Sequence, residues 1–148
     1  MSEQTIKKVL ITGANGVIGN TLMRYYKHNN QAVVGVDLVG NGTDIVQGDI
    51  AEPDTIANLL EECDVIVHTA ALVSNAMEDS DMWRVNVLAT GNLIDAAKKY
   101  KVRRFVQISS IVAYGNAAEG EINENHPVHA DGGSYVLTKL ASEHTVLA

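Results

Sequence analysis

The feature that most constrains the fold is a glycine-containing segment near the N-terminus, residues 12–19, which reads Thr-Gly-Ala-Asn-Gly-Val-Ile-Gly. It follows Lys8–Thr12, a short apolar and β-branched run that predicts a buried strand. It leads into residues 17–28, whose apolar side chains recur at helical spacing. The sequence therefore predicts a strand, a tight turn and a helix in direct succession.

Each glycine of this turn has a steric reason to be there. Gly13 permits a tight exit from the strand, Gly16 lets the backbone approach a phosphate, and Gly19 lets the helix pack closely on the sheet. The free N–H groups at the helix N-terminus then face an anion. The turn is predicted to hold the pyrophosphate of a dinucleotide.

The rest of the chain continues the alternation of strands and helices. Further strands are predicted at Gln31–Val36, Thr43–Gln47, Asp64–His68 and Arg104–Ile108, and further helices at about 54–62, about 80–100 and Tyr135–Leu147. The helix at 80–100 is expected to bury Val85, Leu88, Leu93 and Ala96 or Ala97. This alternation predicts an α/β fold of one domain, residues 1–148, with a doubly wound parallel sheet of order 3-2-1-4-5.

Composition and charge exclude several classes of protein. The chain has 148 residues, 46% of them hydrophobic, and a net charge of −7, which disfavours nucleic-acid binding. No apolar run reaches the roughly 18 residues that cross a bilayer, and the polar segment Met1–Lys8 does not resemble a signal peptide. Cys63 is the single cysteine, so an internal disulfide is excluded and a reducing compartment, the cytoplasm, is expected.

Two acids end predicted strands. Asp37 lies about twenty residues after the glycine turn, where a carboxylate accepts hydrogen bonds from both ribose hydroxyls and repels a 2′-phosphate. This favours NAD over NADP. Asp49 ends the third strand and is placed to reach an adenine amino group, although a solvated strand-end acid is the alternative interpretation.

The residues that suggest chemistry come late in the chain. Tyr135 and Lys139 are four residues apart, which places them on one face of the predicted helix. A nearby ammonium lowers the pKa of a phenol, so Tyr135 is a candidate base for a substrate hydroxyl. Ser109 and Ser110 directly follow the fifth strand, at the sheet edge where ligands of such folds bind.

These motifs together resemble the extended short-chain dehydrogenase/reductases, the NAD-dependent epimerases and dehydratases that act mainly on nucleotide sugars. The matching segments are residues 12–19, 36–38, 48–50, 68–71, 86–97, 108–115 and 135–139. The resemblance implies a catalytic set of Ser110, Tyr135 and Lys139. It implies cofactor contacts at Gly13, Asn15, Gly16, Val17, Ile18, Gly19, Asp37, Leu38, Asp49, Ile50, Thr69, Ala70, Ala71, Asn86, Ser109, Tyr135 and Lys139.

The same resemblance implies NAD as cofactor and a small-molecule substrate, a nucleotide sugar. No metal site is expected, since His126 and His129 match no ligand pattern and are interpreted as solvated loop residues. No nucleic-acid or membrane partner is expected either. A homodimer is expected by analogy, or self-association through an open edge at the fifth strand.

Length is the main departure from the family, whose members are generally twice as long. The chain is therefore interpreted as the N-terminal portion of a longer enzyme, truncated after the helix at 135–147, with the substrate-binding part absent. A natural short protein is the other interpretation. Two functions stay open: hydride transfer of the epimerase or dehydrogenase type, and a cofactor-binding module or sensor without turnover.

Overall fold

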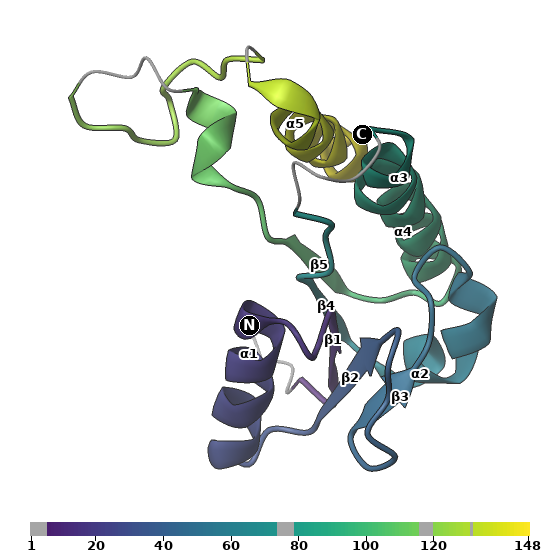
Figure 1. Cartoon of the computed structure of the whole chain (residues 1–148). Coiled ribbons are helices and arrows are strands. Elements are labelled where there is room, and N and C mark those ends of the chain that lie inside the picture. The colour runs from purple at the N-terminus through teal and green to yellow at the C-terminus, as the bar shows by residue number, and fades with distance from the viewer. Residues whose placement is uncertain (1–5, 74–78, 116–119, 131) are drawn as a thin grey trace.

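The computed structural model describes residues 6–73, 79–115, 120–130 and 132–148, and Figure 1 shows their arrangement. A parallel sheet of order β3-β2-β1-β4-β5 forms the centre. Its strands are β1 (Val9–Thr12), β2 (Val33–Asp37), β3 (Ile45–Gln47), β4 (Val65–His68) and β5 (Arg104–Gln107). The predicted fold class and strand order are confirmed. The expectation that Met1–Lys8 is not a signal peptide concerns, in part, residues 1–5, which lie outside the described residues.

Helices cover both faces of this sheet. They are α1 (Val17–His28), α2 (Ala57–Glu62), α3 (Asp79–Trp83), α4 (Ala89–Lys99) and α5 (Gly133–Leu147). Three shorter segments join them: the 3-10 turns η1 (Pro53–Ile56) and η3 (Ile111–Tyr114), and the π-helical turn η2 (Arg84–Leu88). None of the described helices is both long enough and apolar enough to span a membrane.

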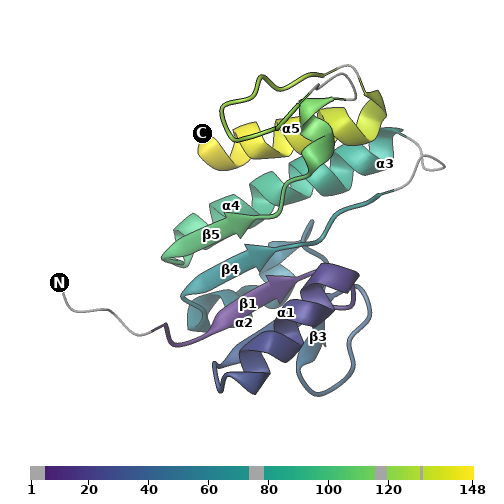
Figure 2. The same cartoon turned by 90° about the vertical axis from the view of Figure 1, so that its left-hand side faces the viewer.

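Alternation along the strands divides the core into two clusters. Leu10 and Ile66 point to the face covered by α2 and α4, whereas Val9, Ile11 and Val67 point to the face covered by α1. Figure 1 shows α1 on one side of the sheet and α2 and α4 on the other. Figure 2 shows α5 running alongside α4. Strands β1 and β4 are buried along their whole length, as strands of a covered parallel sheet should be.

The third strand is shorter than predicted. Residues 43–47 were expected to be extended, but β3 begins at Ile45. The Asn41 side-chain oxygen accepts hydrogen bonds from the backbone N–H groups of Thr43, Asp44 and Ile45. This local turn holds residues 43 and 44 out of extended conformation, so pairing starts only at Ile45, opposite Gly35.

The predicted helix at 80–100 is present as three segments, α3, η2 and α4. Leu93, Ala96 and Ala97 are buried as predicted, but Leu88 is 63% exposed, so its predicted burial is wrong. The π-helical turn accommodates an extra residue and so shifts the helical register at that point. A constant helical period from the sequence therefore placed Leu88 on the wrong face.

Candidate cofactor and active site

The glycine turn is closely packed against the segment that follows β4, at Thr69 and Ala70. Gly13 has a φ of +68°, and a Cβ at this position would lie 2.7 Å from the Ala70 backbone. A Cβ at Gly19 would overlap the Gly13 carbonyl oxygen and lie 2.9 Å from the Ala14 Cα. A side chain at either position would displace backbone, so the tight turn and the close helix that the sequence predicted depend on glycine.

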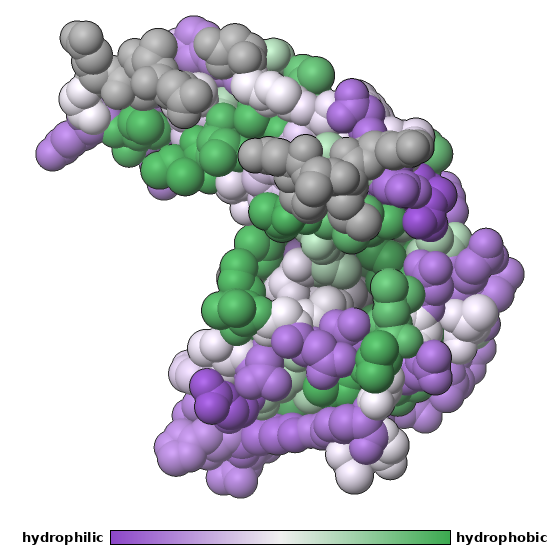
Figure 3. Space-filling view, in the orientation of Figure 1, coloured by the Kyte–Doolittle hydropathy of each residue, from purple (hydrophilic) through white to green (hydrophobic). Residues whose placement is uncertain are grey.

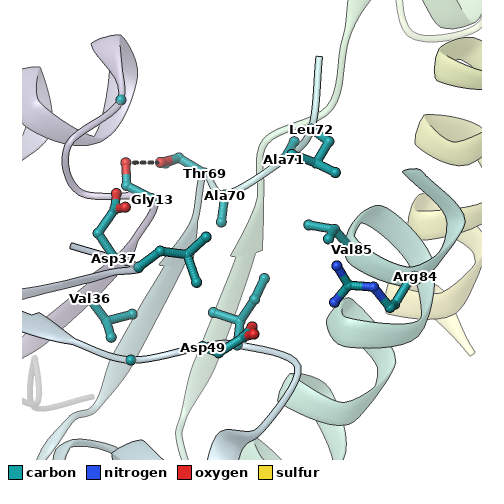
Figure 4. Close-up of a pocket in the computed structure, with 14 residues that line it drawn as sticks. Gly13, Val36, Asp37, Asp49, Thr69, Ala70, Ala71, Leu72, Arg84 and Val85 are labelled. Atoms are coloured by element: carbon teal, nitrogen blue, oxygen red, sulfur yellow. Dashed lines mark hydrogen bonds between the residues drawn. The ribbon is translucent and has the colours of Figure 1, made fainter. Parts of the chain in front are cut away.

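A pocket of about 250 Å³ opens beside this turn at the carboxyl edge of the sheet. Its walls come from the glycine turn, the end of β2, the segment after β3, the segment after β4 and the turn η2 (Figure 4). The lining residues are Gly13, Gly16, Val36, Asp37, Leu38, Gly48, Asp49, Ile50, Thr69, Ala70, Ala71, Leu72, Arg84 and Val85. In Figure 3 this face of the molecule is hollowed, with apolar side chains around the hollow.

Asp37 and Asn15 form one unit at the mouth of the pocket. The Asn15 backbone N–H donates to Asp37 Oδ2 over 2.9 Å, and the Asn15 side-chain amide donates to the Val39 carbonyl over 2.6 Å. Asn15 therefore holds the end of β2 against the glycine turn and does not line the pocket itself. Asp37 does line it, with a carboxylate that retains capacity to accept further hydrogen bonds.

A buried histidine supports the wall formed by residues 69–72. The Thr90 hydroxyl donates to the Asn86 carbonyl, so it accepts from His68 Nε2–H, over 3.0 Å. His68 Nδ1 is then the acceptor for the Thr12 hydroxyl over 2.5 Å, and the Ala70 N–H donates to Thr12 Oγ1 over 3.4 Å. Burial, and to a lesser extent the Lys139 charge, lowers the pKa of His68 to about 3. His68 is thus a neutral link between β1, β4 and α4.

Asn86 fixes the other end of this wall. Its side-chain oxygen accepts from the Leu72 N–H over 2.7 Å, and its amide donates to the Leu72 carbonyl over 3.0 Å. The same amide donates to Thr138 Oγ1 over 3.1 Å, and the Thr138 hydroxyl donates to the Tyr135 carbonyl. Asn86 is buried, lines neither this pocket nor the one that adjoins it, and connects the pocket wall to α5.

A second pocket adjoins the first and contains the predicted tyrosine and lysine. Val17, Ile18, Gly19, Val73, Ile108, Ser109, Tyr135 and Lys139 line it together with Gly16, Thr69 and Ala71, which also line the first pocket. The two pockets therefore form one groove along the carboxyl edge of the sheet. Residues separated by over 100 positions in the sequence meet in it.

Lys139 is the most constrained side chain of this second pocket. It is 3% exposed, and its Nζ donates to the Ile108 carbonyl over 2.6 Å. Burial lowers the pKa of Lys139, and the nearby Glu143 carboxylate opposes that shift. The lysine thus joins α5 to the end of β5, next to Tyr135.

The two serines occupy different positions around α5. The Ser109 hydroxyl donates to the Glu143 carboxylate and lines the pocket of Tyr135 and Lys139. Ser110 precedes η3, where its Oγ accepts from the Val112 N–H over 3.5 Å. It lines a third pocket, with Tyr114 and Glu124, that shares Ser109 with the second. The predicted catalytic residues are therefore grouped but divided between two adjoining pockets.

Three residues that line the first pocket, Leu72, Arg84 and Val85, lie outside every motif that the sequence matched. Leu72 directly follows the Ala70-Ala71 pair, and the other two directly precede Asn86, so each adjoins a recognised motif. Arg84 and Val85 belong to η2, and no periodic pattern in the sequence reveals that π-helical turn. Within the described ranges, no group of three His, Cys, Asp or Glu side chains is arranged to hold a metal ion.

Comparison with known proteins gives the family of this fold and site. Residues 9–148 match the model of the NAD dependent epimerase/dehydratase family. The chain belongs to that family. Its match to residues 9–148 takes in the glycine turn, the acids, the serines and the tyrosine–lysine pair, so the resemblance found in the motifs is confirmed.

Individual relatives show how much of a family member the chain represents. It is 33% identical to sterol demethylase protein B of Methylococcus capsulatus, covering 93% of this chain and 45% of that protein. It is 30% identical to a dTDP-glucose 4,6-dehydratase of Streptomyces antibioticus, covering 95% and 48%. A solved UDP-glucose-4-epimerase from Stenotrophomonas maltophila, with bound NAD and formylated UDP-arabinopyranose, superposes with a TM-score of 0.86 at 27% identity, covering 95% and 48%. The chain thus spans about half the length of these relatives.

Proposed function

We propose that this chain binds NAD in the groove and that the groove carries the hydride-transfer chemistry of its family. The observation that supports this most is the continuity of the groove. Gly16, Thr69 and Ala71 line both the pocket of Asp37 and the pocket of Tyr135 and Lys139. A dinucleotide is an elongated ligand whose two ends need two such adjoining spaces.

The residues present fit a dinucleotide along the whole groove. The glycine turn packs so closely that a Cβ at Gly13 or Gly19 would displace backbone, and the N–H groups at the N-terminus of α1 suit a pyrophosphate. The Asp37 carboxylate, oriented by Asn15, suits a ribose diol and disfavours a 2′-phosphate. Asp49 and Ile50 would accommodate the adenine. Ser109, Tyr135 and Lys139 line the other end, where the nicotinamide would lie.

When bound, NAD⁺ supplies a hydride acceptor for a carbinol C–H bond. Tyr135 would take the proton of the substrate hydroxyl as the C–H bond breaks, leaving a ketone and a protonated phenol. The Lys139 ammonium, which lines the same pocket as Tyr135, would hold the nicotinamide ribose. Ser110 would hydrogen-bond the reacting oxygen. In an epimerase the ketone is then reduced again from its other face.

A nucleotide sugar is the proposed substrate. The dehydratase and the epimerase among the relatives are named for dTDP-glucose and UDP-glucose. We further propose that the protein acts in the cytoplasm and self-associates, in part through the edge of β5. Light scattering that shows a monomer at high concentration would contradict the last point.

A cofactor-binding module without turnover is the second candidate. The observation that favours it is length, because the chain spans about half of the relatives it matches. Retention of Ser110, Tyr135 and Lys139 together favours catalysis. Both candidates require NAD binding, and only the first requires the tyrosine.

Calorimetric titration tests the part that both candidates share. NAD⁺ should bind at least about tenfold, or 1.4 kcal/mol, more tightly than NADP⁺ because of Asp37. A folded sample that binds neither dinucleotide contradicts both candidates. Turnover of UDP-, dTDP- and GDP-sugars, lost in Tyr135→Phe with NAD affinity unchanged, supports the enzyme. Tyr25→Phe is the matched control, since Tyr25 is 61% exposed on α1.

A further inference from the structure

Arg84 is a charged residue at the pocket that neither the sequence motifs nor the proposed chemistry uses. It is the first residue of the π-helical turn η2 and lines the same pocket as Asp37 and Asp49. π-Helical turns within longer helices are frequent at functional sites, because they reorient side chains. In this turn the side chains of Arg84 and Val85 line the pocket. The Asn86 side chain instead lies behind the pocket wall and hydrogen-bonds to Leu72.

The guanidinium is directed toward the pocket and faces the side that carries Asp49, as Figure 4 shows. Its ion pair with Asp81 runs from Nε over 3.8 Å, and the two side chains are 55% and 49% exposed. An exposed ion pair at that distance contributes little to the stability of the fold. The pair with Asp81 therefore does not explain why an arginine is at this position. The terminal nitrogens of the guanidinium remain suited to a ligand in the pocket.

The position of Arg84 indicates which part of a bound dinucleotide its side chain would contact. The pyrophosphate belongs at the glycine turn and the ribose at Asp37, which Figure 4 places across the pocket from Arg84. Asp49 and Ile50 define the remaining part, the adenine site. Adenine offers an amino donor beside a ring-nitrogen acceptor, which a carboxylate and a guanidinium match in complementary fashion. Its ring face also attracts a planar cation.

We propose that Arg84 is a further cofactor-binding residue that contacts the adenine base from the side opposite Asp37, with Asp49 beside it. This inference rests on the proposed binding of NAD. Arg84 would act on the affinity for the adenosine half of the cofactor and leave the nicotinamide half unaffected. A residue that only raised the local positive charge would act on every anionic ligand alike.

Binding of three ligands to the intact chain tests this assignment. NAD⁺ and AMP contain adenine, whereas nicotinamide mononucleotide carries a phosphate without it. Arg84→Met should weaken NAD⁺ and AMP binding in calorimetry by about 5- to 20-fold, the range of a partly desolvated cation–π contact. Nicotinamide mononucleotide, measured by competition against NAD⁺, should keep its affinity. Arg84→Lys should restore part of the loss, since it retains the charge without the planar fork.

Arg24→Met is the matched control, because Arg24 is an exposed arginine of α1 away from the pocket lining. It should leave all three affinities unchanged. Unchanged AMP affinity in Arg84→Met, or equal weakening of AMP and nicotinamide mononucleotide, overturns the role of Arg84 while NAD binding by the wild type stands. A folded wild-type chain that binds no adenine ligand overturns the proposed function itself, and this inference with it.

Discussion

Strands β4 and β5 pair residue for residue, but their surroundings differ. Val67 and Val106 are partners in the register, and Val67 is 6% exposed whereas Val106 is 37% exposed. All four residues of β4 are buried, while Arg104 and Val106 of β5 face solvent. The sheet is thus covered on both faces at β4 and on one face only at the edge strand β5.

This difference separates the two ends of the groove. The adenosine end is lined largely by residues at the ends of β1, β2 and β4, strands that have core residues on both faces. The Tyr135 end depends on Ile108 and Ser109 after β5 and on α5. Binding of the cofactor and positioning of the catalytic residues therefore have different structural support. Each should respond to its own set of substitutions.

The largest effect is expected in the glycine turn. Gly19→Ala places a Cβ against the Gly13 carbonyl and the Ala14 backbone. It should lower the free energy of unfolding by at least about 3 kcal/mol and abolish NAD binding, because backbone rather than a flexible side chain must move. Urea unfolding and calorimetric titration measure the two outcomes.

Gly91→Ala in α4 is its control. A Cβ there meets Thr145 Cγ2 at 3.6 Å, an ordinary contact, and alanine favours a helix by about 0.5–1 kcal/mol. It should therefore stabilise the chain slightly. Equal stability of the two variants would show that the turn adapts and that glycine is not required there.

An intermediate effect is expected from truncating the paired valines. Val67→Ala removes buried methyl groups and should lower the free energy of unfolding by about 2 kcal/mol. Val106→Ala should cost about 1 kcal/mol or less, since part of its side chain already contacts water. Equal losses in urea unfolding would contradict the contrast between β4 and β5 and would indicate that β5 is covered on both faces in solution.

The last effect depends on pH, with a slope of about 1.4 kcal/mol per pH unit at most, and concerns His68. Below about pH 6.5 an unfolded chain takes up a proton at this histidine, whereas the folded pKa is about 3. The unfolded state then binds more protons, so this contribution to stability is complete above pH 6.5 and is lost as the pH falls toward 3.

His68→Gln removes the titration and should show a shallower loss of stability between pH 6.5 and 4 than the wild type. The measurement is urea unfolding at several pH values. His144→Gln, at an exposed position of α5, is the matched control and should keep the wild-type slope. A slope that His68→Gln leaves unchanged would show that the histidine is not held neutral between Thr12 and Thr90.

The sequence by itself determined the element order, the strand order and the glycine turn, because each rests on local preferences or on short-range spacing. Helix α1 coincides with its predicted range, 17–28. The tyrosine–lysine pair and Asp37 were found in the same way, from their distances along the chain to a strand or a helix end.

Tertiary structure decided what local patterns cannot encode. The Asn41 side chain shortened β3, and the π-helical turn moved Leu88 to the surface and Arg84 to the pocket. Asn15 and Asn86 hold Asp37 and Leu72 in place through hydrogen bonds that their positions in the sequence do not predict. These outcomes depend on hydrogen bonds and packing between residues far apart in sequence. Periodicity predicts which face of an element is apolar, but only the assembled fold sets which partners a polar side chain reaches.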